Sequence, residues 1–428
     1  MERIKTFGRT TFSSLKIRNY RWYFIGQAVS LSGTWMQTVA LGWLVLQITG
    51  SGTQVGIVVA LQFLPMLFLG PWGGLVADRF DKRKILYATQ VAFGVATFAL
   101  SILVFLDAVS ILGLYLFALS FGMVRVFDNP TRQTFVGELV GNEQLKNAVS
   151  LNATVNNLAR AVGPSIAGIL IAGIGMGFCF FFNALTYVVT FWTLTQMRQS
   201  ELHTVPPKKK TKGEIKEGFR YVMATPLIRN TLIMMALIGT FVFEFQVSLP
   251  ILAEGVFHGD ASSYAALLSA MGIGSVLGGL FAAGRKSIAP RQLVFFIFFF
   301  GVSMIATALM PTLALATLGM FIVGFFSINV TSLGNTMLQL ESKPEMRGRV
   351  MALWGMAMLG STPIGGPIIG YIGEHFGGRW GIGVGGAMAL FTALFALITI
   401  LKKDTTEKIP ESVEEKTEEM SVQSVKIP

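Results

Sequence analysis

The sequence is poor in the residues that build disulfides and metal centres. Its 428 residues include one cysteine, Cys179, and three histidines, His203, His258 and His375. A lone cysteine excludes an intramolecular disulfide, and histidines so far apart do not have the spacing of zinc ligands. No phosphate-binding loop follows a strand. We therefore expect no metal and no cofactor, and if the protein does work, an ion gradient must supply the energy.

Charge is scarce as well. Charged residues make up 13% of the chain and hydrophobic residues 52%, with a mean hydropathy of +0.61, whereas soluble domains carry about 25% charged residues. The apolar residues form about twelve segments long enough to cross a bilayer. These segments are approximately 20–44, 55–76, 85–106, 111–127, 148–171, 177–197, 227–252, 264–283, 293–309, 313–333, 350–372 and 380–401. The sequence predicts an all-α integral membrane protein with twelve transmembrane helices.

The positive charge that is present has a pattern. The net charge is +11, and Lys and Arg gather in the N-terminal segment and in alternate connections, at 79–84, 198–229, 285–291 and 343–349. This alternation follows the positive-inside rule and predicts a multi-pass protein of the cell membrane with both termini in the cytoplasm. Binding to a nucleic acid or another polyanion explains the alternation less well.

The two halves of the chain resemble one another. Gly73–Ala77 and Gly278–Ala282 share a Gly-Gly-Leu-x-Ala pattern at a displacement of 205 residues, and Gly163-Pro164 and Gly366-Pro367 are displaced by 203. We expect two six-helix bundles, residues 1–197 and 227–402, joined by a cytoplasmic linker, 198–226, and followed by a disordered tail, 403–428. Parallel repeats of this kind enclose a substrate site near the membrane midplane.

Three charged residues lie inside the apolar segments. Arg160 is 12 residues into its segment, roughly 18 Å along a helix, where an arginine facing lipid costs about 2.5–3.5 kcal/mol. We expect Arg160 and Arg125 to face a substrate cavity. Glu244 is a candidate proton-coupling site, because a carboxyl group in a low dielectric readily takes up a proton. A static structural network is the alternative for all three.

Polar residues recur at helical spacing in two segments. Gln27, Thr34 and Gln37 follow one face of the first helix, and Asn335 lies on a similar face of the tenth. We expect these residues to line the cavity. Interhelical hydrogen bonding is the alternative role for them.

The connection after the second helix holds a dense cluster of charge. Gly74 is followed by Asp78, Arg79 and Arg83. Asp78 ends its helix, where a carboxylate meets the unfavourable end of the helix dipole, so we expect it to need a partner elsewhere. In the fifth helix, Gly163, Pro164 and Gly168 predict close approach of another helix and a bend.

These motifs resemble those of the major facilitator superfamily. The pattern Gly74-x3-Asp78-Arg79-x-Asp81-Lys82-Arg83 is similar to its loop signature, with Asp81 in place of the usual glycine. The pattern Ser150-x8-Ala159-x3-Gly163-Pro164-x2-Ala167-Gly168 is similar to its antiporter motif, with small residues in place of several glycines. The runs Phe127–Gln133 and Arg347–Met351 resemble the third drug:proton antiporter family, the branch with macrolide and enterobactin exporters.

The resemblance implies a gate and a cavity. In the superfamily the aspartate corresponding to Asp78 latches the two halves near the start of the eleventh helix, here near Arg349. On this basis Asp128, from the fourth helix, is expected to pair with Arg79 or Arg83. The first, fourth, seventh and tenth helices are expected to line the cavity.

The expected function is secondary transport by a monomer. We expect export of an amphipathic small molecule, such as a drug, macrolide or siderophore-like compound, in exchange for protons. A proton-coupled importer of a small solute has the same fold and differs in the direction of flux. A non-transporting membrane receptor agrees less well with the repeat and the intramembrane charges, and no reactive constellation indicates an enzyme.

Overall fold

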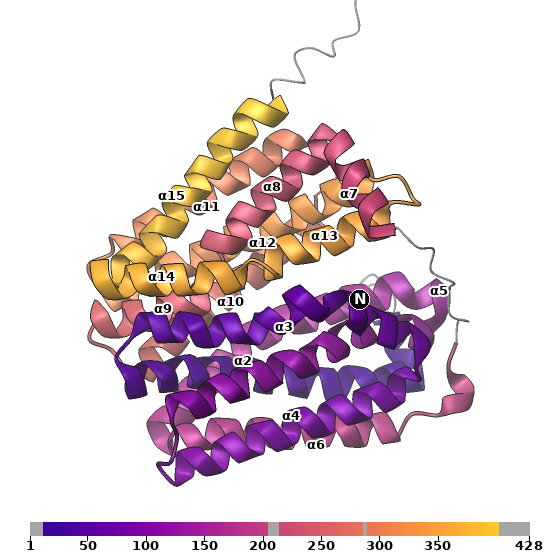
Figure 1. Cartoon of the computed structure of the whole chain (residues 1–428), viewed down its shortest axis with the longest axis horizontal. Helices are drawn as coiled ribbons and strands as arrows, with labels where there is room; N and C mark the ends of the chain where they lie inside the picture. The colour runs from indigo at the N-terminus through magenta and orange to yellow at the C-terminus, as the bar shows by residue number, and fades with distance from the viewer. Residues whose placement is uncertain (1–11, 204–213, 286–288, 402–428) are drawn as a thin grey trace, which may run out of the picture.

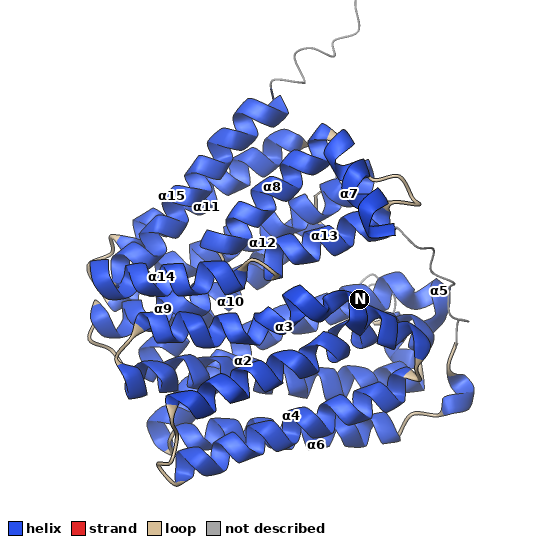
Figure 2. Ribbon diagram, viewed as in Figure 1, coloured by secondary structure: helices blue, strands red, loops and turns tan. Residues whose placement is uncertain are grey.

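The computed structural model describes residues 12–203, 214–285 and 289–401. In this part of the chain every regular element is a helix (Figure 2). The elements of the first half are η1 (Ser13–Lys16), α2 (Arg18–Thr49), α3 (Gly52–Arg79), α4 (Lys82–Phe105), α5 (Ile111–Gly173), α6 (Met176–Thr195) and η2 (Gln199–Glu201). Those that follow are α7 (Glu214–Ala224), α8 (Pro226–Phe241), α9 (Phe245–Gly255), α10 (Ala261–Ala283), α11 (Pro290–Ala308), α12 (Leu313–Glu341), α13 (Arg347–Leu359), α14 (Thr362–Phe376), α15 (Gly378–Ala396) and η3 (Leu397–Leu401).

The helices account for twelve membrane crossings. Ten helices in the described residues are long and apolar enough to cross a bilayer, with α8 and α9 counted as one. One of the ten, α5, has 63 residues and folds back at Gly141, whose φ of 66° and ψ of 179° are not helical, so it crosses twice. The pair α13 and α14, with 13 and 15 residues, supplies the remaining crossing.

Two crossings differ from the continuous helices that the sequence predicts. The seventh is divided between Phe241, where α8 ends, and Phe245, where α9 begins. The eleventh is divided between α13 and α14 near Gly360 and Ser361. Interrupted helices at membrane depth occur where backbone is buried in protein or lines a cavity.

The two halves of the chain occupy different parts of the molecule. Helices α2–α6, from indigo to magenta, lie together in the lower part of Figure 1, and α8–α15, from rose to yellow, lie above them. The most extensive contacts between the halves join α3 with α14 and α5 with α10, and smaller ones join α9 with α2 and α3 and α10 with α2. The linker helix α7 packs on α8 and α13 of the second half. The basic stretch 206–210 and the tail 403–428 lie outside the described residues.

The two ends of the helix bundle are named here by their features. The basic end holds η1, the turn between α3 and α4, α7 and the start of α13; the far end holds the turn between α2 and α3 and the end of α14. At the far end Gly50 adopts φ +62°, the left-handed conformation that suits glycine. At the basic end Asp81 caps α4, accepting a hydrogen bond of 2.9 Å from the Arg83 backbone N–H.

Candidate substrate passage and its charged residues

The halves are in close backbone contact at the far end, where α3 crosses α14. A Cβ atom at Gly56 would lie 2.3 Å from the carbonyl oxygen of Gly366, and one at Gly370 would lie 2.3 Å from the carbonyl oxygen of Gly52. Only glycine permits this approach, which resembles the small-residue contacts of other membrane helices. The four glycines seal one side of the interface between the halves.

A carboxylate strengthens the same contact. Glu374, near the end of α14, accepts hydrogen bonds from the Ser51 hydroxyl at 2.7 Å and from the Thr53 backbone N–H at 2.9 Å. The Thr53 hydroxyl also donates to it, at 2.6 Å. A carboxylate at a helix N-terminus satisfies free backbone donors and interacts favourably with the helix dipole. Glu374 therefore acts as a cap for α3 that comes from the other half of the protein.

The second contact between the halves joins α5 and α10. The hydroxyl of Ser165 donates to that of Ser269 at 2.9 Å. A Cβ atom at Gly272 would lie 2.6 Å from the Cα atom of Ala161. This contact also lies in the part of α5 that leads to the far end.

The small residues of α5 that were predicted to allow helix packing do lie at close helix contacts. A Cβ atom at Gly163 would lie 2.6 Å from the carbonyl oxygen of Ser32 on α2, and one at Gly168 would lie 3.0 Å from the Cβ atom of Ala265 on α10. Pro164 is buried between them. The small face of α5 thus packs within its own half at Gly163 and across the interface at Gly168.

Toward the basic end, glycines of α3 and of α13 have no neighbour from the opposite half. A Cβ atom added at Gly70 or Gly74 of α3, or at Gly348 or Gly355 of α13, would meet no atom within 4 Å. The side chain of Trp72 is 60% exposed. The predicted gate residue Gly74 therefore faces open space. The glycines of α3 and α14 at the far end thus contact the opposite half, and these four glycines toward the basic end do not.

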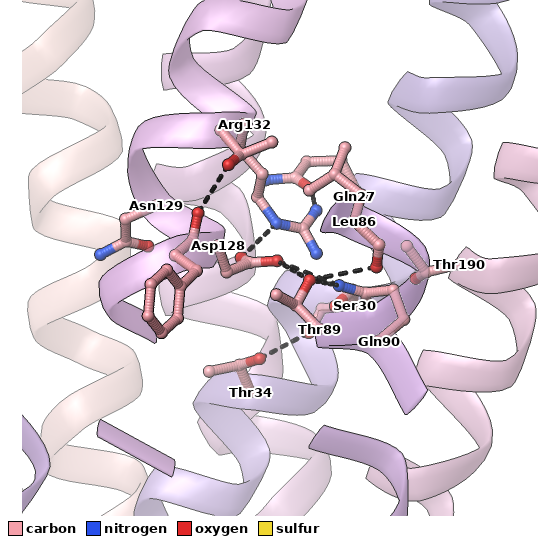
Figure 3. Close-up of polar contacts among 12 residues, drawn as sticks. Gln27, Ser30, Thr34, Leu86, Thr89, Gln90, Asp128, Asn129, Arg132 and Thr190 are labelled. Atoms are coloured by element: carbon pink, nitrogen blue, oxygen red, sulfur yellow. Dashed lines mark hydrogen bonds and ion pairs between the residues drawn. The ribbon is translucent and has the colours of Figure 1, made fainter. Parts of the chain in front are cut away.

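A buried polar network fills the first half between α2, α4 and α5 (Figure 3). Asp128 is 5% exposed and accepts hydrogen bonds from the Thr89 hydroxyl at 2.7 Å and the Gln90 amide at 3.1 Å. Arg132, one turn along α5, forms an ion pair with Asp128 and donates to the side-chain oxygen of Gln27. Gln27, predicted to line the cavity, is thus joined to the predicted gate residue Asp128.

The predicted pairing of Asp128 with Arg79 or Arg83 is wrong in this conformation. Arg83 donates instead to the Tyr87 hydroxyl at 2.7 Å and to the Leu194 carbonyl oxygen at 3.2 Å, and Arg79 is exposed. Distance along the helix explains the difference. Arg83 lies in the first turn of α4, about 9 Å before the residues that contact Asp128.

The rest of the charged turn is also more structured than a solvated loop. Lys82 forms an ion pair of 2.5 Å with Glu138 of α5, and both side chains are largely buried. Asp78 is exposed at the end of α3. The interaction of Asp78 with the start of the eleventh helix stays a prediction.

Two arginines on α5 lie against aromatic rings. The guanidinium of Arg125 is 5.2 Å from the ring centre of Phe63 on α3 and 5.9 Å from that of Phe121. The guanidinium of Arg160 is 5.2 Å from the ring centre of Trp35 on α2, and its Nε atom is buried without a hydrogen-bond partner. Both side chains are partly exposed. No carboxylate within the described residues pairs with either guanidinium.

Glu244 lies in the break between α8 and α9. It is 3% exposed, and its Oε1 atom has no hydrogen-bond partner. A Cβ atom at Gly365 of α14 would lie 3.1 Å from Oε1, and one at Gly366 would lie 3.6 Å from Oε2. Gly366 also contacts Gly56 of α3. The carboxyl group therefore lies beside the contact that seals the two halves.

The polar face of the first crossing turns away from the passage. Gln37 is 3% exposed and accepts hydrogen bonds from Asn183 of α6 at 2.6 Å and Thr97 of α4 at 3.2 Å. Thr34 donates to its own helix, and its hydroxyl is 3.5 Å from that of Tyr187. The prediction that Gln37 lines the cavity is wrong, because these polar groups satisfy one another inside the first half.

In the tenth crossing, Asn335 has a local partner. Its side-chain oxygen accepts a 2.5 Å hydrogen bond from Gln339, one turn further along α12. Asn335 is partly buried and Gln339 is exposed. A role for Asn335 in substrate contact stays a prediction.

Potential metal ligands are scattered through the part of the chain that the structure describes. Within it, no group of three or more His, Cys, Asp or Glu side chains could hold a metal ion. Cys179 is buried, and its sulfur lies 3.9 Å from the Ala167 carbonyl oxygen.

The profile of a family described as "Transmembrane secretion effector", a branch of the major facilitator superfamily, matches residues 9–426. The chain belongs to this family. It is therefore a multi-pass membrane transporter, with a small molecule as substrate and the lipid bilayer as its surroundings. The expected all-α major facilitator fold is confirmed.

Curated relatives share 23–25% of their aligned residues with this chain. The "Staphyloferrin A transporter" of Staphylococcus aureus is 23% identical over 295 residues, which cover 67% of this chain and 72% of the relative. The "Enterobactin exporter EntS" of Shigella boydii is 25% identical over 359 residues, 83% of this chain and 85% of the relative. The protein of the same name from Escherichia coli is also 25% identical, over 361 residues.

Solved structures share the fold. A POT family transporter in complex with a thioalcohol-conjugated peptide superposes with a TM-score of 0.74 at 12% identity, over 90% of this chain and 96% of that one. A bacterial homologue of the lysosomal transporter Spinster, in an inward-facing and occupied conformation, has a TM-score of 0.69 at 16% identity, over 90% and 97%. At such identities the likeness concerns the fold alone.

In this transporter, Asp128 has partners that its sequence did not lead us to expect. Arg132 stands four residues after Asp128, the spacing at which helical side chains meet, and this signal was present in the run Phe127–Gln133. Thr89 and Gln90 belong to another crossing, and the sequence carries no sign that they face Asp128. Their role follows only from the packing of α4 on α5.

Proposed function

We propose that the chain exports amphipathic, siderophore-like small molecules across the cell membrane by alternating access, in exchange for protons. Both termini lie in the cytoplasm in this proposal, so the basic end of the bundle is cytoplasmic and the far end is external. Residues 1–197 and 227–402 are the two moving bundles, and the working unit is a monomer.

One observation carries the alternating-access part of the proposal. The two halves are in backbone contact at the far end through glycines of α3 and α14, whereas glycines of α3 and α13 toward the basic end face open space. A transporter that closes one end while the other is parted has the geometry of one state of a two-state cycle. In this proposal the present conformation faces the cytoplasm.

The relatives supply the substrate and the direction. One is named a staphyloferrin A transporter and others are named enterobactin exporters. Both names refer to siderophores, and the second also states export. The proposal carries this substrate class and direction over to the present chain.

Proton coupling is assigned to Glu244. Its carboxyl group lies in the break between α8 and α9, beside Gly366 of α14, which contacts Gly56 of α3 across the interface. Charging or neutralising a carboxyl group in such a place changes the cost of keeping it buried. Proton binding at Glu244 would therefore favour one arrangement of the α3–α14 contact over the other.

The cytoplasmic gate is assigned to the charged turn after α3. When the basic end closes, Gly74 allows α3 to approach α13, and Asp78, Arg79 and Arg83 form the latch with the start of α13. Asp128 serves the gate indirectly in this proposal, because its network with Arg132 fixes α4 relative to α5.

The test is transport in proteoliposomes with an imposed proton gradient. Purified protein is reconstituted, and flux of enterobactin and of staphyloferrin A is followed with and without the gradient. Proton-dependent flux is expected for the wild type, and Glu244→Gln is expected to lose its dependence on the gradient. Proton-driven movement of the compound in the direction of proton flow, with accumulation on the side that the protons enter, would identify an importer instead.

Glu254→Gln is the matched control, since Glu254 is an exposed glutamate on the same helix, α9. It should keep full coupling. Unchanged coupling in Glu244→Gln would remove the assignment of Glu244. If neither compound is transported in either direction, the siderophore-like substrate class is wrong.

A further inference from the structure

Among the charged residues deep inside the described crossings, the positive charges outnumber the negative ones. Well inside the membrane-spanning segments lie Arg125, Asp128, Arg132, Arg160 and Glu244. Asp128 and Arg132 neutralise one another as an ion pair. Asp128 also attracts Arg125 from a longer distance, so three arginines share two carboxylates, of which Glu244 lies in the second half. An uncompensated charge inside a membrane is costly and usually marks a functional site.

Arg125 and Arg160 lie at the same depth. Arg125 is 14 residues after Ile111, where α5 begins, and Arg160 is 13 residues before Gly173, where α5 ends. At 1.5 Å per residue, each is about 20 Å from the far end of its crossing. The two residues therefore stand at about one level on two antiparallel crossings of the first half.

Arg160 borders the interface between the halves. The next residue, Ala161, lies against Gly272 of α10 in the second half. Its guanidinium rests on Trp35 of α2, with Nε buried and unpaired. The accessible part of this side chain cannot face lipid without a cost of about 2.5–3.5 kcal/mol, so it faces the passage.

Arg125 borders the interface on the other flank. It rests on Phe63 of α3, and Leu67, one turn further along α3, is the side chain that a Cβ atom at Gly360 would meet at 3.1 Å. Gly360 lies in the break between α13 and α14. The face of α3 that supports Arg125 is thus the face turned toward the second half.

Neither arginine has, among the described residues, a hydrogen-bond acceptor on the N–H edge of its guanidinium. An aromatic ring beneath a guanidinium interacts with its face, whereas carboxylates bind to its N–H edge, often through two parallel bonds. In the residues that the structure describes, no acceptor binds to the side chain of Arg125 or Arg160. The rings of Phe63 and Trp35 provide planar surfaces beside these edges.

We propose that Arg125 and Arg160 are the substrate-binding cations of the passage, and that the transported molecule is an amphipathic anion. It carries a carboxylate or a comparable acidic group beside an aromatic or apolar body. This inference rests on the proposed function as a transporter of amphipathic molecules, and it adds the charge that the substrate must have and the residues that recognise it.

The experiment compares two ligands of the same size and shape, one with an anionic carboxylate and the other with a neutral amide. Protein in lipid nanodiscs is titrated calorimetrically with 2-naphthoate and with its neutral amide, 2-naphthamide, and empty nanodiscs correct for partition into lipid. We expect saturable binding of the carboxylate and at least about tenfold weaker binding of the amide, since hydrogen bonds to a charged group contribute about 1.5–3 kcal/mol. Equal binding of the two ligands, or no saturable binding of 2-naphthoate, would overturn the proposal.

Variants then assign the effect to residues. Arg125→Gln and Arg160→Gln should each weaken 2-naphthoate binding about tenfold or more and leave 2-naphthamide binding unchanged, while the lysine variants should retain part of the affinity. Arg291→Gln, at an exposed arginine in the first turn of α11, is the matched control and should bind both ligands as the wild type does. Full carboxylate affinity in both glutamine variants would contradict the assignment.

The binding experiment can fail or succeed independently of the test of the proposed function. The ligand comparison uses wild-type protein without a gradient, so it needs no variant to fold and no coupling to work. Loss of proton-driven flux with retained charge discrimination would remove the antiport mechanism alone. Retained flux without charge discrimination would remove the anion site alone.

Discussion

At the scale of single residues, the Asp128–Arg132 pair shows how charge is kept inside this protein. The carboxylate has donors from two crossings, and the guanidinium also donates to Gln27. A buried ion pair contributes little to stability overall, because desolvation offsets the attraction. Removing one partner is nevertheless expensive, about 3–5 kcal/mol, since the other charge is left uncompensated.

The pair therefore predicts strong coupling between two substitutions. Asp128→Ala and Arg132→Gln should each lower the thermal unfolding temperature, with a loss of about 3–5 kcal/mol. The double variant should lose much less than the sum, because it leaves no unpaired charge. The measurement is a double-mutant cycle by thermal unfolding in one detergent. Additive losses would mean that the two side chains do not act as a pair.

Individual side chains were the hardest features to predict from the sequence. Arg132 lies one helical turn from Asp128, so their pairing follows from local helix geometry. Whether Arg83 reaches Asp128 depends instead on the position of α4 along α5, which the sequence does not give. Gln37 had the right spacing for a polar face. The sequence could not tell whether this face meets a cavity or the neighbouring helices α4 and α6.

At the scale of elements, hydropathy predicts the crossings well because the bilayer fixes their length. The breaks in the seventh and eleventh crossings were missed, since they arise where two backbones meet. A Cβ atom at Gly365 of α14 would lie 1.7 Å from the carbonyl oxygen of Thr240, in the last turns of α8. The close contact between α8 and α14 positions Glu244, and no residue pattern within a single helix predicts this contact.

Gly365 is therefore expected to tolerate no side chain. Gly365→Ala should destabilise the protein by about 1–3 kcal/mol, because the atom it meets is backbone and cannot move aside cheaply. The readout is the unfolding temperature together with the monodisperse yield. Gly355→Ala on α13 is the control, since a Cβ atom there meets no atom within 4 Å. An unchanged unfolding temperature in Gly365→Ala would show that α8 and α14 are not in backbone contact.

At the scale of the whole molecule, the closed far end depends on contacts between the halves. Glu374 accepts three hydrogen bonds from Ser51 and Thr53 across the interface. These bonds exist only while α14 stands at the start of α3, so they stabilise the state with the far end closed.

Weakening this cap should change the balance of states. Glu374→Gln keeps the size of the side chain and removes its charge, so it should raise the population with the far end open, about fivefold if the charge-assisted bonds lose 1 kcal/mol. The measurement is the distance between a spin label on α3 and one on α14, both at the far end, by pulsed electron resonance. A short and a long distance distinguish the closed and the open state of the far end. Glu143→Gln, at the exposed basic-end position Glu143, should leave the distribution unaltered. An identical distribution in Glu374→Gln would show that the cap does not hold the far end.

Transport of an anion by this molecule depends on the membrane potential as well as on concentration. A cell interior is electrically negative, and moving one elementary charge across the membrane potential changes the free energy by about 2.3 kcal/mol per 100 mV. An anion bound by Arg125 and Arg160 is therefore driven outward by the potential, in the direction of the proposed export. In proteoliposomes without a proton gradient, a potassium diffusion potential should accelerate efflux of a charged substrate from a negative interior and slow it from a positive one. A neutral analogue should show no such dependence on the sign of the potential, and efflux of the anion that ignores the potential would contradict its movement as a net charge.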